Sequence, residues 1–245
     1  MLNLLIALAV GLLVTLLIKI AGFAIWAGVV PGTIAFIGCY IFLARRIALK
    51  VQALSKSAEK ELSAQPTNQR ERQQRIEKAI KLLEEGLVYE RWQFLVGPEI
   101  HAQIGMIRYV SKDYPQAEAH LIKANARNFM AKALNAALFY QRKEYDKMER
   151  AFESAVKSGK KEAVVWAAYA WCLSQIKEKE KAMKVMARAV AANPSDEKLK
   201  SGLNALQNDK KLRMKAFEPL WWQFGLEQPP LQVQGGGRRV QFQRR

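Results

Sequence analysis

The sequence contains few of the residues on which several common classes of protein depend. Only two cysteines occur among 245 residues, which excludes a disulfide-stapled scaffold and a zinc site with four thiolate ligands. The two histidines, His101 and His120, have no metal-ligand spacing and no cysteine nearby. No G-x-S-x-G, H-E-x-x-H or Walker glycine loop occurs, and the glycine run at 235–237 lacks a flanking strand and helix. We therefore expect no catalytic site, no metal, no cofactor and no enzymatic activity.

Charge is nearly absent from the N-terminal 43 residues, where the only charged side chain is Lys19. An apolar run of this length is too long for one membrane span of about 20 residues and long enough for two. We therefore predict a transmembrane hairpin at residues 1–43, with its first span at 2–18 and its turn between Lys19 and Gly32. Pro31 either forms that turn or kinks the second helix. A single span preceded by a signal or re-entrant piece is the alternative, although a basic start and a cleavage site are lacking.

Basic residues follow the apolar block at once, beginning with Arg45, Arg46 and Lys50. Positive charge beside a span stays in the cytoplasm, so we predict a protein of a bacterial-type inner membrane whose soluble part is cytoplasmic. We assign these three residues to the membrane surface, where basic side chains attract anionic lipid. Binding of nucleic acid would need clustered basic residues with stacking aromatics and is disfavoured. Four glycines either permit close approach of the two spans or reflect only the frequency of glycine in such helices: Gly22, Gly28, Gly32 and Gly38.

An internal repeat dominates residues 70–207, which carry almost no strand signal and have apolar residues at helical spacing. Four segments share the spacing small-x3-large-x2-small, and the intervals between their first members are 38, 31 and 34 residues. Loops with Asp113 and Glu144 precede two of these segments. The residues in this pattern are Ala79, Leu83 and Gly86; Ala117, Leu121 and Ala124; Met148, Phe152 and Ala155; and Ala182, Met186 and Ala189.

The last three segments each follow a first helix with small residues at its centre, at Gly105, Ala136 and Ala170. This arrangement resembles the tetratricopeptide repeat over roughly residues 98–194, with residues 70–90 as an additional degenerate helix. The second repeat departs from the usual pattern of the family. Met148 stands where an alanine is usual, and Asn135-Ala136 stand where the family has Leu-Gly. The resemblance implies a core of Gly105, Ala117, Leu121, Ala124, Phe152, Ala155, Trp166, Ala182, Met186, Ala189 and Pro194.

The expected fold is therefore all-α, with four parts. A transmembrane hairpin at 1–43 leads into a basic juxtamembrane helix and linker at 44–69. A short α-solenoid of about three repeat-like helix pairs with a capping helix follows at 70–207, and a basic, aromatic, flexible tail forms 208–245. An irregular helical bundle is the alternative to the solenoid.

The resemblance also implies a concave groove lined by the first helix of each pair. Its lining would include Met106, Tyr109, Ala137, Tyr140 and Trp171, which are mostly apolar and aromatic. Such a groove suits a peptide or an amphipathic helix of a protein partner. The alternative is that the aromatic residues only pack between helices.

Trp221 and Trp222 belong to an aromatic segment near the C-terminus. Three interpretations of this segment are open. It folds back over the groove or the end of the stack, it lies at the bilayer interface, or it docks on another protein. We assign both tryptophans to the membrane surface because tryptophan favours that depth.

Together these features predict a membrane-anchored scaffold or adaptor that binds a protein partner through its groove. A bracing subunit of a larger secretion, motility or envelope-assembly machine is the second possibility. Binding of anionic lipid or nucleic acid through the basic surface is the third. Two spans followed by a repeat domain is similar to the layout of HemY-type inner-membrane proteins, although the repeat domain here is far shorter.

Overall fold

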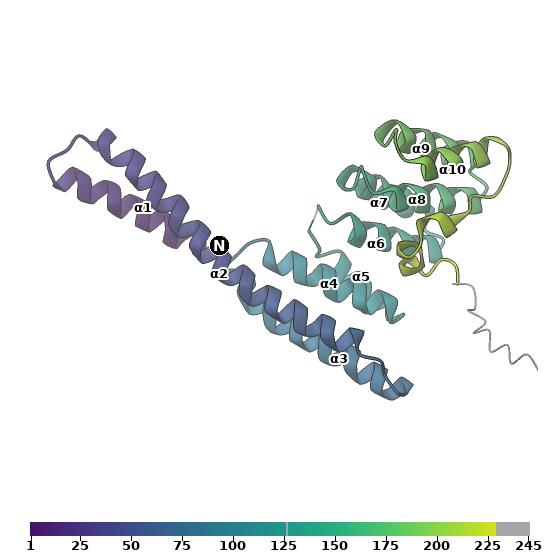
Figure 1. The fold of residues 1–245 in the computed structure, drawn as a ribbon, viewed down its shortest axis with the longest axis horizontal. Helices are drawn as coiled ribbons and strands as arrows, with labels where there is room; N and C mark the ends of the chain where they lie inside the picture. Colours follow the sequence, from purple (N-terminus) through teal and green to yellow (C-terminus); the bar gives the residue numbers. More distant parts are fainter. Residues whose placement is uncertain (126, 229–245) are drawn as a thin grey trace, which may run out of the picture.

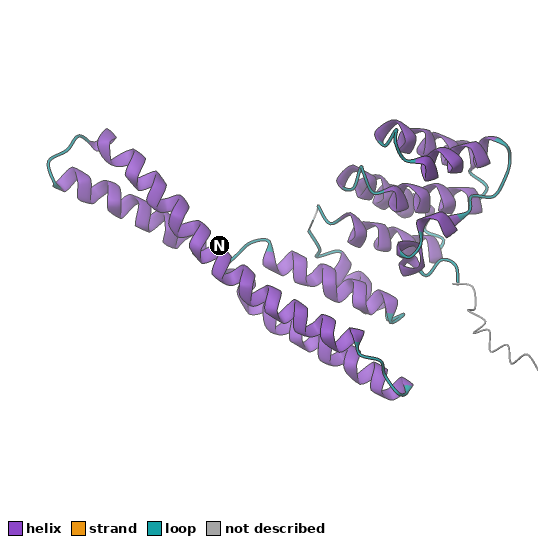
Figure 2. Ribbon diagram, viewed as in Figure 1, coloured by secondary structure: helices purple, strands orange, loops and turns teal. Residues whose placement is uncertain are grey.

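The computed structural model describes residues 1–125 and 127–228, and this part of the chain is all-helical without a strand (Figures 1 and 2). The all-α prediction is thus confirmed for the described residues. The last part of the predicted basic tail, residues 229–245 with Arg238, Arg239, Arg244 and Arg245, lies outside them. The helices are α1 Leu2–Ile20, α2 Ile25–Ser63, α3 Gln69–Glu85, α4 Val96–Val110, α5 Tyr114–Leu121, α6 Phe129–Gln141, α7 Tyr145–Ser158, α8 Ala163–Gln175, α9 Lys179–Ala192 and α10 Glu197–Gln207, with 3₁₀ helices η1 Gly86–Arg91, η2 Met214–Phe217 and η3 Leu220–Phe224.

The two N-terminal helices are long and apolar enough to span a membrane by length and composition. They lie side by side, joined by the short turn at residues 21–24 (Figure 1). Gly22 occupies that turn with a φ of +90°, a backbone conformation that costs glycine little. Of the two roles considered for Pro31, turn formation is wrong, because this residue lies inside α2.

Close packing of α1 on α2 depends on three glycines and one threonine. A Cβ on Gly32 would lie 2.1 Å from Thr15 Oγ1, and a Cβ on Gly28 or on Gly11 would lie 2.9 Å from a carbonyl oxygen of the other helix. The Thr15 hydroxyl contacts both helices, because Gly11 O lies 3.0 Å and Gly28 O 3.2 Å from its oxygen. Gly28 and Gly32 are therefore contact residues.

Helix α2 continues far beyond its apolar part. Its 39 residues extend about 58 Å at a rise of 1.5 Å per residue, so the predicted boundary between residues 43 and 44 is not a break in the helix. The chain reverses at 64–68, and the Asn68 side chain caps α3 by accepting a bond from Glu71 N at 2.8 Å. The distal half of α2 then packs on α3 and α4 around a small core of Ala58, Ala79, Ile80, Leu83, Ile100 and Ile104.

Helices α4 to α9 form three successive pairs, α4 with α5, α6 with α7 and α8 with α9 (Figure 1). The turn within each pair has the same geometry. Lys112, Lys143 and Lys177 adopt φ values of 64°, 62° and 68°. In each turn the N–H of the following acidic residue donates to a carbonyl five residues earlier, as in Glu178 N to Leu173 O at 3.0 Å. The sequence repeat is therefore matched by a repeated backbone conformation.

Most residues assigned to the repeat core are buried. Gly105 packs so closely on Leu121 that an added Cβ would lie 2.9 Å from that side chain. Ala124 is half-buried, and Pro194 is exposed in the turn before α10. Its assignment to the core is wrong, because the turn that it closes lies at the surface. The buried members are Gly105, Ala117, Leu121, Phe152, Ala155, Trp166, Ala182, Met186 and Ala189.

Candidate functional site

The predicted groove residues lie on one inner face of the molecule, formed by α4, α6 and α8. Tyr109, Ala137 and Trp171 are buried there, with 2, 0 and 6 % of their surface exposed. Met106 and Tyr140 are half-buried. The structure thus brings these residues to a common side, but it leaves little of that side open to a partner.

The covering segment, residues 212–226, explains this burial. Its apolar side chains belong to the same core cluster as the inner face: Leu212, Met214, Phe217, Trp221 and Phe224 are buried, and Trp222 and Leu226 are half-buried. The covering segment runs back past α10 toward α8 and α6 (Figure 1). Of the three interpretations of the aromatic segment, the first is the one observed, and residues 212–226 are packed rather than a flexible tail.

One hydrogen bond joins the covering segment to α4, and a second lies at the end of the segment. The Tyr109 hydroxyl donates a hydrogen bond to Phe224 O at 2.6 Å, and burial raises the pKa of Tyr109, so that the phenol remains a donor. The Trp221 indole N–H donates to Glu227 Oε2 at 2.9 Å. The Trp221 ring meets Trp171 edge-on with centroids 5.2 Å apart. The assignment of Trp221 to the membrane surface is therefore wrong, because its side chain is fully buried.

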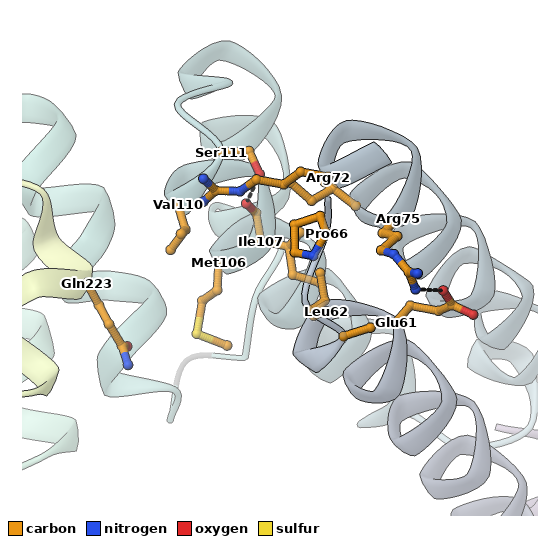
Figure 3. A pocket seen from close by; sticks show the side chains of 12 residues that line it. Glu61, Leu62, Pro66, Arg72, Arg75, Met106, Ile107, Val110, Ser111 and Gln223 are labelled. Carbon is orange, nitrogen blue, oxygen red and sulfur yellow. Dashed lines mark hydrogen bonds and ion pairs between the residues drawn. The ribbon is translucent and has the colours of Figure 1, made fainter. Parts of the chain in front are cut away.

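An open cleft remains beside this covered face, between the end of α2, α3 and α4 (Figure 3). It has a volume of about 450 Å³. Of the five predicted groove residues, Met106 lies in its lining. Gln223 of η3 stands on its other side, so the covering segment forms one edge of the cleft. The remaining lining residues are Glu61, Leu62, Ala64, Pro66, Arg72, Arg75, Ile76, Ile107, Val110 and Ser111.

The charges around the cleft are unevenly compensated. Arg75 pairs with Glu71 at 2.8 Å and with Glu61 at 3.5 Å. A hydrogen bond from Lys78 lowers the pKa of Glu61, and one from the Thr67 backbone lowers that of Glu71, so both carboxylates are ionised at neutral pH. No ion pair from a described residue reaches Arg72. Its exposed guanidinium leaves the rim with an available positive charge.

Comparison with protein-family models, with curated proteins and with solved structures finds no match.

Sequence reasoning missed most of this cleft. The groove prediction followed the first helices of the three repeats, which begin at α4, whereas seven of the twelve lining residues come from the end of α2, the turn after it and α3. One signal was present in the sequence: Met106 and Val110 are four residues apart and so lie on one side of α4. Val110 is 56 % exposed although it is apolar.

A second polar cluster lies away from the cleft, where the two histidines meet. His101 Nδ1 and His120 Nδ1 are 3.0 Å apart, a contact that requires one ring to donate and the other to accept. The pKa of His101 is lowered first by burial and then by the charge of Lys123. The pKa of His120 is also lowered first by burial, and then by His101, Lys123 and Arg108. Glu90 opposes the shift at His101. The pair is therefore neutral at neutral pH.

This pair makes stability depend on pH. Because both pKa values are lower in the folded chain than the ordinary value of 6.5, the unfolded chain binds protons first as the pH falls. The stabilisation is complete above about pH 6.5 and is lost below it. Both rings are partly exposed, so solvent screens them and the effect is small. When the pH is lowered from 7.5 to 5.5, we expect the unfolding midpoint of the wild type to fall further than that of His120→Gln, by on the order of 1 °C. Thermal unfolding in mild detergent measures this, and identical pH slopes would contradict it.

Proposed function

We propose that this chain is a membrane-anchored helical adaptor that holds a protein partner at the cytoplasmic face of a bacterial-type inner membrane. The apolar character of α1 and of the first half of α2 supports the anchor. Exposed Arg45, Arg46 and Lys50 lie within α2, directly after its apolar part, and this placement favours the cytoplasmic side for the rest of the chain. Binding, rather than catalysis, is the mode of action that we propose.

The body of the adaptor is proposed to be a short solenoid of the tetratricopeptide-repeat type. Three observations support this proposal. The turns at Lys112, Lys143 and Lys177 repeat one backbone geometry. Small residues sit where paired helices approach closely, as Gly105 does against Leu121. Helix α10 closes the row after α9, with Asp196 capping its first turn.

The open cleft is the proposed binding site, and it carries the functional proposal. It is apolar along Leu62, Ile76 and Met106 and has the uncompensated Arg72 at its rim. An amphipathic helix or short peptide of the partner, with an apolar face and an acidic residue beside it, matches both properties. The inner face at Tyr109 and Trp171 is not proposed as the site, because the covering segment already fills it.

Site-specific crosslinking in cells tests this proposal. A photoreactive benzoylphenylalanine at Val110, inside the cleft, should crosslink to a partner segment rich in apolar and acidic residues, identified by mass spectrometry. The same residue at Lys184, exposed on α9, is the matched control and should give no such adduct. Adding Met106→Gln should reduce the adduct about tenfold, since the buried amide has no hydrogen-bond partner in an apolar contact. Equal crosslinking from both positions would contradict the proposal.

Bracing of a larger membrane assembly is a second candidate, favoured by the uninterrupted helix α2. This helix runs without interruption from its apolar part, which packs on α1, to its distal half, which packs on α3 and α4. A continuous helix of this kind holds the two parts of the chain at a fixed distance. A bracing subunit would crosslink to neighbours from its outer helices, including position Lys184, as strongly as from the cleft. The same experiment therefore distinguishes the two functions.

A further inference from the structure

Residues 86–95, here called the connecting segment, expose an unusual amount of apolar surface. The connecting segment contains η1 and joins α3 to α4. Val88, Phe94, Leu95 and Trp92 are 69, 54, 42 and 37 % exposed. Such residues are found singly on soluble surfaces, but four within eight positions form a patch that something else covers.

Hydrogen bonds attach the connecting segment to the beginning of α1. The amino group of Met1 donates to Arg91 O at 2.5 Å, and Asn3 N donates to Trp92 O at 3.3 Å. The Gln93 side chain donates to the Tyr40 hydroxyl on α2 at 3.1 Å. Three points of contact therefore hold this segment at the level where α1 begins and the apolar part of α2 ends.

That level coincides with the edge of a bilayer. Helix α1 has 19 residues and is about 28 Å long, close to the hydrocarbon thickness of about 30 Å. If α1 spans the membrane, its first residues lie at one boundary and Lys19 lies at the other. Exposed Arg45, Arg46 and Arg91 surround the first boundary, where lipid headgroups are found and where tryptophan is enriched.

We propose that the connecting segment inserts Val88, Trp92, Phe94 and Leu95 into the headgroup region of the cytoplasmic leaflet. Its partner is an anionic lipid surface: the apolar side chains enter the bilayer, and the neighbouring arginines pair with lipid phosphates. This second attachment fixes the height and tilt of the repeat body above the membrane. The inference rests on the proposed membrane anchor and adds a lipid contact that the anchor does not require.

Spin labels on the full chain, reconstituted in vesicles of phosphatidylcholine and phosphatidylglycerol, test this inference. Native Cys39 and Cys172 are replaced by alanine, and one cysteine is introduced per variant. Phe94→Cys reports on the connecting segment, Leu12→Cys on the middle of α1, and Lys184→Cys on the exposed surface of α9. Collision with oxygen, relative to collision with a water-soluble nickel chelate, measures the depth of each label.

We expect the oxygen-to-nickel ratio at Phe94→Cys to lie between the other two and to exceed that at Lys184→Cys several-fold. A label at Phe94→Cys as accessible to nickel as that at Lys184→Cys, with Leu12→Cys deep in the bilayer, would overturn the inference and leave the anchor intact. Nickel access at Leu12→Cys would overturn both. A Phe94→Cys label that is immobile but exposed to nickel would indicate a protein contact and would also overturn the inference.

Discussion

Replacing Trp221 with alanine should lower the free energy of unfolding by about 3–5 kcal/mol, the usual cost of truncating a fully buried aromatic side chain. The Trp221 side chain is 0 % exposed. It contacts the ring of Trp171 and, with centroids 5.8 Å apart, that of Phe224. Removing it opens a cavity between the covering segment and α8 and leaves Glu227 without its indole donor. For a chain of this size we expect the unfolding midpoint to fall by roughly 10 °C, measured by circular dichroism in mild detergent.

Leu220→Ala is the matched control for this prediction. Leu220 neighbours Trp221 in the same 3₁₀ helix but is 38 % exposed, so its truncation should cost no more than about 1 kcal/mol. A similar small effect of both substitutions would show that the covering segment does not pack on the inner face in solution. Trp221→Ala should also increase the binding of an apolar dye, because it loosens the cover over Tyr109 and Trp171.

The helices were predictable because their signals are local. Spacing of three and four residues identified the paired helices, and pairs such as Ala117 and Leu121 are buried together as the pattern requires. The chain also reverses within the predicted juxtamembrane part at 44–69, where Asn68 caps the N-terminus of α3. These signals depend on residues within one turn or two of each other, so no knowledge of the tertiary structure was needed.

What covers a helix face is not a local property. The repeat resemblance implies that Tyr109 and Trp171 line one groove, and the structure places both in one buried cluster. An open groove and a covered core need the same apolar residues, so the resemblance could not tell them apart. The covering segment itself is irregular, with 3₁₀ helices and a left-handed Gly225 at φ +57°. It therefore has no helical period from which its partner face could be inferred.

The burial of Trp221 was missed for a related reason. The sequence assigns Trp221 to the bilayer surface because tryptophan favours that depth. The structure instead places Arg91, and with it the neighbouring Trp92, beside Met1, because Met1 N donates to Arg91 O across ninety positions of the chain. Depth in a bilayer depends on which segments the fold brings to the end of α1, and sequence distance does not report it.

Gly32→Leu should separate α1 from α2. A Cβ at this position would lie 2.1 Å from Thr15 Oγ1 and 2.8 Å from Gly11 O, and the latter atom belongs to a helical backbone that cannot move alone. Overpacking usually costs about 1–3 kcal/mol, and the larger side chain also displaces the Thr15 hydroxyl from its contact with Gly28 O. In lipid, where close packing is a main source of helix association, we expect this cost to shift the pair toward separated helices.

Distances between two spin labels measure this separation, with Leu8→Cys on α1 and Ile34→Cys on α2 in a background without native cysteines. Both positions are exposed, at 49 and 66 %, so the labels do not disturb the contact. We expect a narrow distance distribution in the parent chain and a broad, longer one in Gly32→Leu. Gly38→Leu is the control: no atom lies within 4 Å of a Cβ there, so the narrow distribution should persist. Identical distributions for the two glycine variants would mean that the glycines do not determine how α1 meets α2, and that their number reflects only the composition of apolar helices.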